Sequence, residues 1–259
     1  MLKFTCSFGL AWLGLCMAPL TAAVVFEDNF ESYADTAALT AVWTGNGNLS
    51  LSNSGNPGKS ASNSGVATTN PTNSNVNVVN FGPFNPTATE HLRLTGQMFD
   101  DGTSSNERMS IGLRHDSGPN IIEMGFYNSP VYYAARVISF QSGNPNWVVF
   151  PNLAAPPALL TTPVAGWHTF TVEISNDTVD FTLDLGSDGT IDSTQSFNSV
   201  ATAAGFNQVR IGGPSGFSSP GGPASFDNIR LETIAVPEPT SAGLCVLLGG
   251  MFMIRRRRR

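Results

Sequence analysis

The chain has few cysteines and little positive charge, and both are concentrated at its ends. Its three cysteines are Cys6, Cys16 and Cys245. The segment 24–235 contains none of them and must therefore fold without a disulfide. The same segment carries seven basic residues against 18 acidic ones, a net charge of −11. Such a segment offers no basic surface for nucleic acid or anionic lipid.

The residue types of catalytic and metal centres are also scarce. The three histidines, His91, His115 and His168, are scattered, and none has a second His or Cys at metal-ligand spacing. The run GPSGF at 213–217 departs at its last position from the Gly-x-Ser-x-Gly pattern of a nucleophile elbow. We therefore predict a non-catalytic protein. A Ser/His/Asp triad assembled from distant positions stays open.

The first 23 residues have the three parts of a secretory signal peptide. Lys3 supplies the basic start, residues 8–15 form an apolar run, and Thr21, Ala22 and Ala23 are small. This order predicts export with cleavage after Ala23.

The last 24 residues, 236–259, form a second targeting segment. The motif Pro237-Glu238-Pro239 precedes an apolar run at 242–254, and five arginines follow at 255–259. Thirteen helical residues span about 20 Å, short of the roughly 30 Å hydrocarbon core, and the arginines should stay on the cytoplasmic side. This order resembles the PEP-CTERM sorting signal of bacterial surface proteins. The resemblance implies membrane insertion by the tail, processing by an exosortase-type enzyme, and delivery to the cell surface or extracellular matrix. An uncut tail anchor is the alternative.

Between these ends, the composition predicts a single all-β domain at 24–235. The firmest feature is a hairpin in which apolar residues alternate at 169–174 and again at 179–185. Residues 52–75 indicate either a long loop or a pair of short edge strands. Short strands punctuated by Gly, Pro and Asn imply an antiparallel two-sheet β-sandwich. Further strands are expected at 91–94, 109–114, 121–127, 131–140, 147–150, 208–211 and 226–233.

Three short runs carry a second resemblance. They are FEDNFE at 26–31, GWHTF at 166–170 and FDNIRL at 226–231. Together they resemble the concanavalin A-like lectin/glucanase (LamG-like) jelly roll, which implies that the first and last strands lie side by side. The glucanase branch of that family carries Glu-x-Asp-x-x-Glu on one strand, and neither Glu123 nor Glu173 begins such a run.

Two acidic features invite comparison with calcium sites. The lectin-like resemblance implies a structural calcium between Asp28 and Asp227; the alternative is that Asp227 binds neighbouring backbone. The stretch 184–192 is similar to a calcium loop, but it lacks the oxygen ligand at position three and has Gln195 where a bidentate glutamate is needed. Asp188-Gly189 favours a turn there instead.

Aromatic residues provide the remaining functional hypothesis. Tyr127, Tyr132 and Trp147 lie near one another in the sequence, and aromatic rings stack on the apolar faces of sugars. The alternative is that they belong to the core. The sequence thus predicts an exported protein that binds glycan or promotes adhesion in an exopolysaccharide matrix. A matrix or coat component without a specific ligand, or a glycoside hydrolase relative, are the alternatives.

Overall fold

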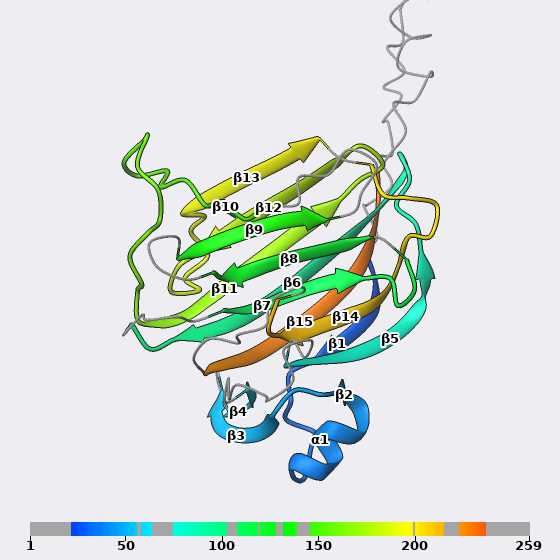
Figure 1. Ribbon diagram of the computed structural model, residues 1–259, viewed down its shortest axis with the longest axis vertical. Helices are drawn as coiled ribbons and strands as arrows, with labels where there is room; N and C mark the ends of the chain where they lie inside the picture. Colours follow the sequence, from blue (N-terminus) through cyan, green and yellow to red (C-terminus); the bar gives the residue numbers. More distant parts are fainter. Residues whose placement is uncertain are drawn as a thin grey trace, which may run out of the picture.

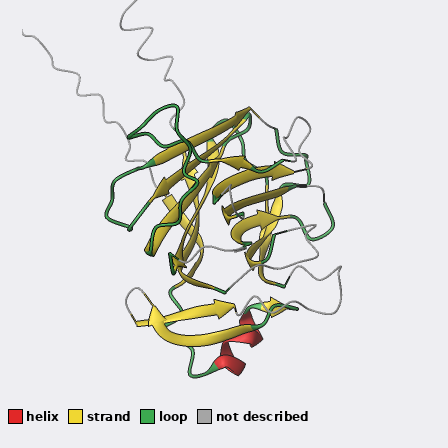
Figure 2. Ribbon diagram, turned by 60° about the vertical axis from the view of Figure 1, so that its left-hand side comes forward, coloured by secondary structure: helices red, strands yellow, loops and turns green. Residues whose placement is uncertain are grey.

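A computed structural model describes residues 22–55, 58–63, 75–102, 108–118, 120–127, 132–138, 146–198, 200–214 and 223–236. These residues form two antiparallel sheets packed into a β-sandwich (Figures 1 and 2). The predicted fold class is confirmed. The sorting motif at Pro237, Glu238 and Pro239 and the apolar run after it lie outside the described residues.

One sheet, called sheet A here, has eight strands. Strand β1 (Ala22–Asp28) pairs with β15 beside the main path of the sheet. The other seven follow one another in the order β13 (Ser193–Asn198), β12 (Thr178–Asp184), β11 (Gly166–Ile174), β6 (Glu90–Asp100), β15 (Ala224–Ala235), β4 (Gly58–Asn63) and β3 (Leu49–Gly55).

The opposite sheet, sheet B, has seven strands. Their order is β10 (Val148–Val149), β9 (Tyr133–Ile138), β8 (Ile121–Phe126), β7 (Met109–Arg114), β14 (Phe206–Gly212), β5 (Val76–Phe84) and β2 (Thr44–Gly45).

The two ends of the domain are neighbours. In the β1–β15 pair, Phe26 lies opposite Leu231 and Asp28 opposite Ile229. This confirms the expectation that the first and last strands lie side by side. Cleavage after Ala23 would remove two terminal residues of β1 and leave the register from Val24 onward.

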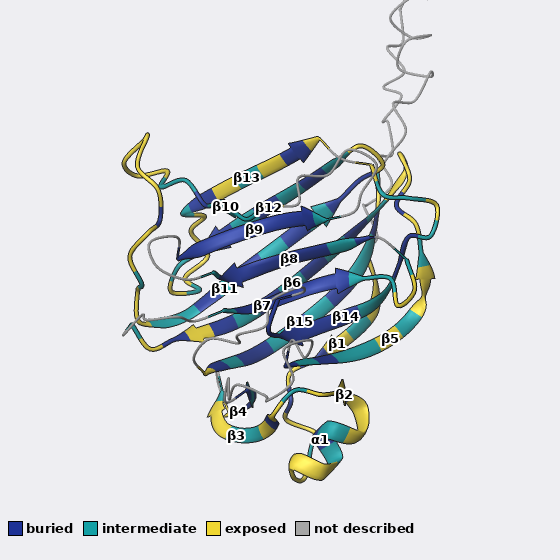
Figure 3. Cartoon of the chain, in the orientation of Figure 1, coloured by how far each residue is buried: buried dark blue, intermediate teal, exposed yellow. Residues whose placement is uncertain are grey.

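The core lies between the sheets, and strand alternation builds it. Phe170 of β11 faces Leu183 of β12, and Val172 faces Phe181, so the predicted hairpin has the expected inward face. These side chains are buried, and burial alternates along β6, β11 and β12, whereas β7, β8 and β9 are buried along almost their whole length (Figure 3). On β6, β11 and β12 one face is therefore committed to the core, and the other face lies at the surface.

Two local elements refine the sequence-based expectation. Helix α1 (Thr36–Val42) was not expected; Asp35 caps it by accepting a hydrogen bond from the Ala38 amide at 2.9 Å. Strands β3 and β4 form a hairpin at the edge of sheet A, which is the edge-strand alternative for the first part of 52–75. Within the described ranges, no helix has the length and apolar content needed to cross a membrane.

Candidate functional site

A charged cluster lies on the outer face of sheet B. In β8, Ile122, Met124 and Phe126 point into the core, so Glu123 points outward. One of its carboxylate oxygens lies 2.5 Å from Arg136 of β9, and the other lies 2.5 Å from Arg210 of β14. Glu123 and Arg210 are fully buried, and Arg136 nearly so. The cluster is therefore an ion network shielded from solvent.

The cluster sets one carboxylate against two guanidinium groups. Burial lowers the pKa of Arg210, and the nearby charges of Arg114 and Arg136 lower it further, whereas the Glu123 carboxylate opposes the shift. An arginine nevertheless keeps its proton in proteins. Each carboxylate oxygen of Glu123 is thus engaged by a guanidinium group.

An aromatic pair lies beside this cluster. The rings of Tyr127 and Trp147 are stacked with centroids 4.8 Å apart and an interplanar angle of 18°. The guanidinium carbon of Arg136 lies 4.8 Å from the centre of the Trp147 ring. Both aromatic residues are partly exposed. The structure thus brings together two of the three predicted glycan-binding residues and adds Arg136 to them; we call Tyr127, Trp147 and Arg136 the sheet B platform.

Tyr132 is not part of this platform. Its side chain is only 1% exposed, and its hydroxyl donates to Asp100 at 3.2 Å. Its ring lies nearly perpendicular to that of Tyr133, with centroids 4.9 Å apart. Because no ring face of Tyr132 reaches the surface, the structure gives it a place in the core and does not support a role in glycan binding. Asp100 accepts hydrogen bonds from the hydroxyls of both Tyr132 and Tyr133 in the core. The positions of the two tyrosines in the sequence do not reveal this contact.

The predicted calcium residues serve the backbone and neighbouring side chains. Asp28 accepts hydrogen bonds from the Phe30 amide at 2.7 Å, the Tyr33 hydroxyl at 2.5 Å and the Trp43 indole at 2.8 Å. Asp227 accepts from the Asn228 amide at 2.7 Å. Among the residues that the structure describes, no three His, Cys, Asp or Glu side chains are grouped closely enough to hold a metal ion. The predicted structural calcium is therefore without support.

The acidic stretch 184–192 is a turn, as its Asp-Gly pair favoured. The Asp184 carboxylate accepts hydrogen bonds from the amides of Asp188 and Gly189 at 3.1 and 2.9 Å. Asp192 accepts from the Leu185 amide at 2.8 Å. Both carboxylates thus close the loop between β12 and β13 rather than point together at an ion.

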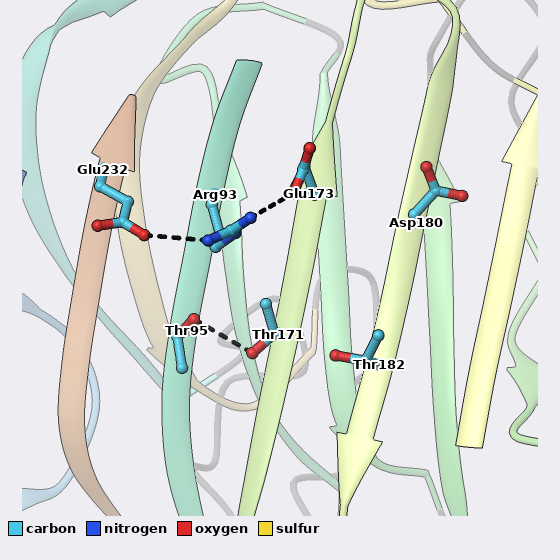
Figure 4. A pocket seen from close by; sticks show the side chains of 7 residues that line it. All are labelled: Arg93, Thr95, Thr171, Glu173, Asp180, Thr182 and Glu232. Atoms are coloured by element: carbon cyan, nitrogen blue, oxygen red, sulfur yellow. Dashed lines mark hydrogen bonds and ion pairs between the residues drawn. The ribbon is translucent and has the colours of Figure 1, made fainter. Parts of the chain in front are cut away.

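The outer face of sheet A carries a hollow of about 520 Å³ (Figure 4). Its seven lining residues are all polar and come from four adjacent strands. This hollow was not predicted from the sequence, although the residues that alternate with the apolar ones on these strands are polar and indicate a polar outer face. The lining residues are Arg93, Thr95, Thr171, Glu173, Asp180, Thr182 and Glu232.

An ion network crosses one end of the hollow. Arg93 lies between Glu173 and Glu232, at 2.8 and 3.4 Å, and His91 contacts Glu173 at 2.9 Å. Burial alone would raise the pKa of Glu173, but the hydrogen bonds from His91 and Arg93 outweigh it and hold the pKa below its usual value. Glu173 is therefore ionised at neutral pH and suited to accepting hydrogen bonds.

Comparison with known proteins adds a likeness of architecture. No family model matches the chain, and no curated protein matches its sequence. Among solved structures, an endo-1,3-β-glucanase from Streptomyces sioyaensis is 17% identical, with 83% of this chain and 97% of that chain covered and a TM-score of 0.44. The CBM2 module of an evolved Dit protein from Lactobacillus casei BL23 phage J-1 is 13% identical, with 85% and 99% covered and a TM-score of 0.46.

A third similar structure comes from work on endo-acting O-glycanases of the human gut microbiota that initiate mucin breakdown. It is 12% identical, with 83% of this chain and 100% of that chain covered and a TM-score of 0.47. At these values the likeness concerns the sandwich alone. The function of this chain has to be inferred from its own side chains.

Proposed function

We propose that this is an exported, non-catalytic glycan-binding protein of the cell surface or extracellular matrix. The observation that carries the proposal is the sheet B platform, in which Arg136 contacts the Trp147 ring and Tyr127 stacks on it. A sugar ring needs an apolar face to stack on and fixed polar groups beside it. The partly exposed rings of Tyr127 and Trp147 supply the apolar face, and Arg136, itself held by Glu123, fixes the Trp147 ring from beneath the surface.

Binding without hydrolysis is favoured by the ion pairs and the burial of Glu123. Glycosidases use two carboxyl groups that flank the bond, one of which must hold a proton. On the strands of the outer face of sheet B that the structure describes, Glu123 is the carboxylate, and it is bonded to Arg136 and Arg210. Both of its oxygens are occupied by these ion pairs, and the group is fully buried, so it is poorly placed to act on a sugar.

A glycan array followed by calorimetry with the best ligand tests this proposal. Wild-type protein is expected to bind, and Tyr127→Ala and Trp147→Ala to weaken binding about tenfold or more, as aromatic anchors do. Val42→Ala is the matched control, because Val42 is an exposed apolar residue on α1. Unchanged affinity in both aromatic variants, with folding intact, would contradict the platform. Absence of any glycan ligand would favour a structural matrix component. Cleavage of the bound ligand would favour a glycoside hydrolase relative.

Export and sorting are the second half of the proposal, and they depend on the two ends of the sequence. We expect a mature protein that begins at Val24 and ends near Pro237, Glu238 and Pro239 after an exosortase-type enzyme has acted. Intact mass of the protein recovered from its native host measures both ends. A mass that retains the five terminal arginines would make this a membrane-tethered protein and would overturn processing at the motif.

A further inference from the structure

Two adjacent strands of sheet A present a continuous outward strip. The inward residues of β6 and β11, such as Leu94 and Val172, are buried in the core. The alternate residues therefore point away from sheet B. We call these eight residues the sheet A strip: Arg93, Thr95, Gln97 and Phe99 of β6, and Trp167, Thr169, Thr171 and Glu173 of β11.

One end of the strip is aromatic. Phe99 and Trp167 form a directly opposed cross-strand pair, with ring centroids 5.4 Å apart and planes inclined at 56°. Phe99 is 38% exposed, and Trp167 is partly exposed. Water contacts the apolar surface of these two rings. A partner that covered the rings would remove this surface from water, which is favourable. This end of the strip therefore offers a stacking platform.

The middle of the strip is built from hydroxyl and amide groups in a fixed arrangement. The hydroxyls of Thr95 and Thr171 are 3.1 Å apart, and the Gln97 amide donates to Thr169 at 3.3 Å. Gln97 is itself held by Asn228, which donates to its carbonyl oxygen at 2.8 Å. Because these groups orient one another, they present donors and acceptors at low entropic cost.

The far end of the strip opens into the polar hollow of Figure 4, where Asp180 and Thr182 extend the surface onto β12. From Trp167 to Glu173 the strand advances six residues, about 20 Å at roughly 3.3 Å each. The aromatic platform, the hydroxyl rows and the hollow thus lie in one line along the β6–β11 pair.

We propose that the sheet A strip is a second carbohydrate-binding surface, which holds a linear, neutral polysaccharide chain along β6 and β11. Stacking rings at one end and rows of hydroxyls beyond them match the alternating apolar faces and hydroxyl edges of such a chain. The hollow contains three carboxylates, Glu173, Asp180 and Glu232, against the single guanidinium of Arg93. This charge disfavours an anionic chain.

A second copy of the protein fits this surface less well. Sheets that pack face to face bury apolar side chains between them. Here the central residues are hydroxyls and ions, and the excess of carboxylates in the hollow would be brought against itself. The surface is independent of the sheet B platform, since it belongs to the opposite sheet.

Calorimetry in the Tyr127→Ala background, which disables the sheet B platform, tests the strip alone. The probes are a soluble neutral β-glucan and a polyuronate of similar length. We expect the glucan to bind, and Trp167→Ala to weaken it about tenfold or more. Thr171→Arg, which places a long side chain in the hollow, should do the same. Val42→Ala serves as the control, and the polyuronate should not bind.

The proposal is overturned if both Trp167→Ala and Thr171→Arg bind the glucan as their parent does. It is also overturned if the polyuronate binds better than the glucan, or if sedimentation shows a dimer that these two variants abolish. Failure of the sheet B platform has a different result, because Tyr127→Ala alone would then leave glycan affinity unchanged. The use of two variants with unrelated chemistry separates loss of binding from loss of folding.

Discussion

The carboxylate of Glu123 on β8 lies 2.5 Å from a guanidinium nitrogen of Arg210 on β14, although β7 runs between the two strands. The strand register places Gly112 of β7 opposite both residues. Because glycine has no side chain, the Arg210 guanidinium crosses β7 and reaches Glu123. Three strands are thereby joined through one buried carboxylate.

Replacing Glu123 with alanine should lower the free energy of unfolding by about 3–5 kcal/mol, because Arg136 and Arg210 would remain buried without this carboxylate. Denaturant unfolding measures the change. Glu27→Ala is the control, since Glu27 makes an exposed ion pair with Arg230 and its loss should change stability little. A small effect of Glu123→Ala would show that the cluster tolerates loss of its anion.

Gly112→Ala tests the close approach of β7 to its neighbour. A Cβ atom at this position would lie 2.1 Å from the backbone oxygen of Ile122, which cannot move without shifting β8. We expect destabilisation of about 1–3 kcal/mol or more, as overpacking causes. Gly82→Ala provides the comparison, because a Cβ atom there meets nothing within 4 Å. Equal melting temperatures for the two variants would contradict the packing argument.

Asp28 joins the first strand to the segment that contains α1. Asp28→Ala removes the acceptor for the Phe30 amide, the Tyr33 hydroxyl and the Trp43 indole, and should cost about 2–4 kcal/mol. Since these donors already occupy the carboxylate, a chelator should leave the melting temperature unchanged. A calcium-dependent melting temperature that Asp28→Ala abolishes would restore the metal hypothesis.

The sequence predicts the faces of a single strand but not the contacts between distant strands. Alternation along 169–174 and 179–185 was enough to predict the hairpin and the inward face of Phe170 and Val172. Alternation within a strand says nothing about register between distant strands, so the meeting of Glu123 and Arg210 could not be predicted. The inward turn of Tyr132 toward Asp100 depends on such a long-range pairing too.

Buried His168 should make stability depend on pH. Its Nδ1 atom accepts from the Gly186 amide at 2.9 Å, and its Nε2 atom lies 2.6 Å from the Val164 carbonyl oxygen. Burial lowers the pKa of His168, although the bond to Val164 opposes this. At the same pH, His168 is therefore protonated less in the native state than in the unfolded chain. Protonation would also add a hydrogen to Nδ1, which would then face the N–H group of Gly186.

The direction of this pH dependence follows from the linkage between proton binding and folding. The full contribution of neutral His168 is present above the unfolded pKa of about 6.5, and stability falls as the pH drops below it toward the lower native pKa. His168→Gln should be less stable at pH 8 and should show a flatter decline between pH 7 and 5. Denaturant midpoints at several pH values measure this. Identical slopes for variant and wild type would assign the pH dependence to other groups.

Two glycan surfaces on opposite sheets imply that one molecule can bridge two polysaccharide chains. If the sheet B platform and the sheet A strip both bind, wild-type protein should raise the low-shear viscosity of a polysaccharide solution at concentrations where sites are filled. Tyr127→Ala and Trp167→Ala should each still bind but lose this effect, because each retains one surface. A rise in viscosity with either single variant equal to that of wild type would mean that bridging arises from self-association and not from two separate glycan surfaces.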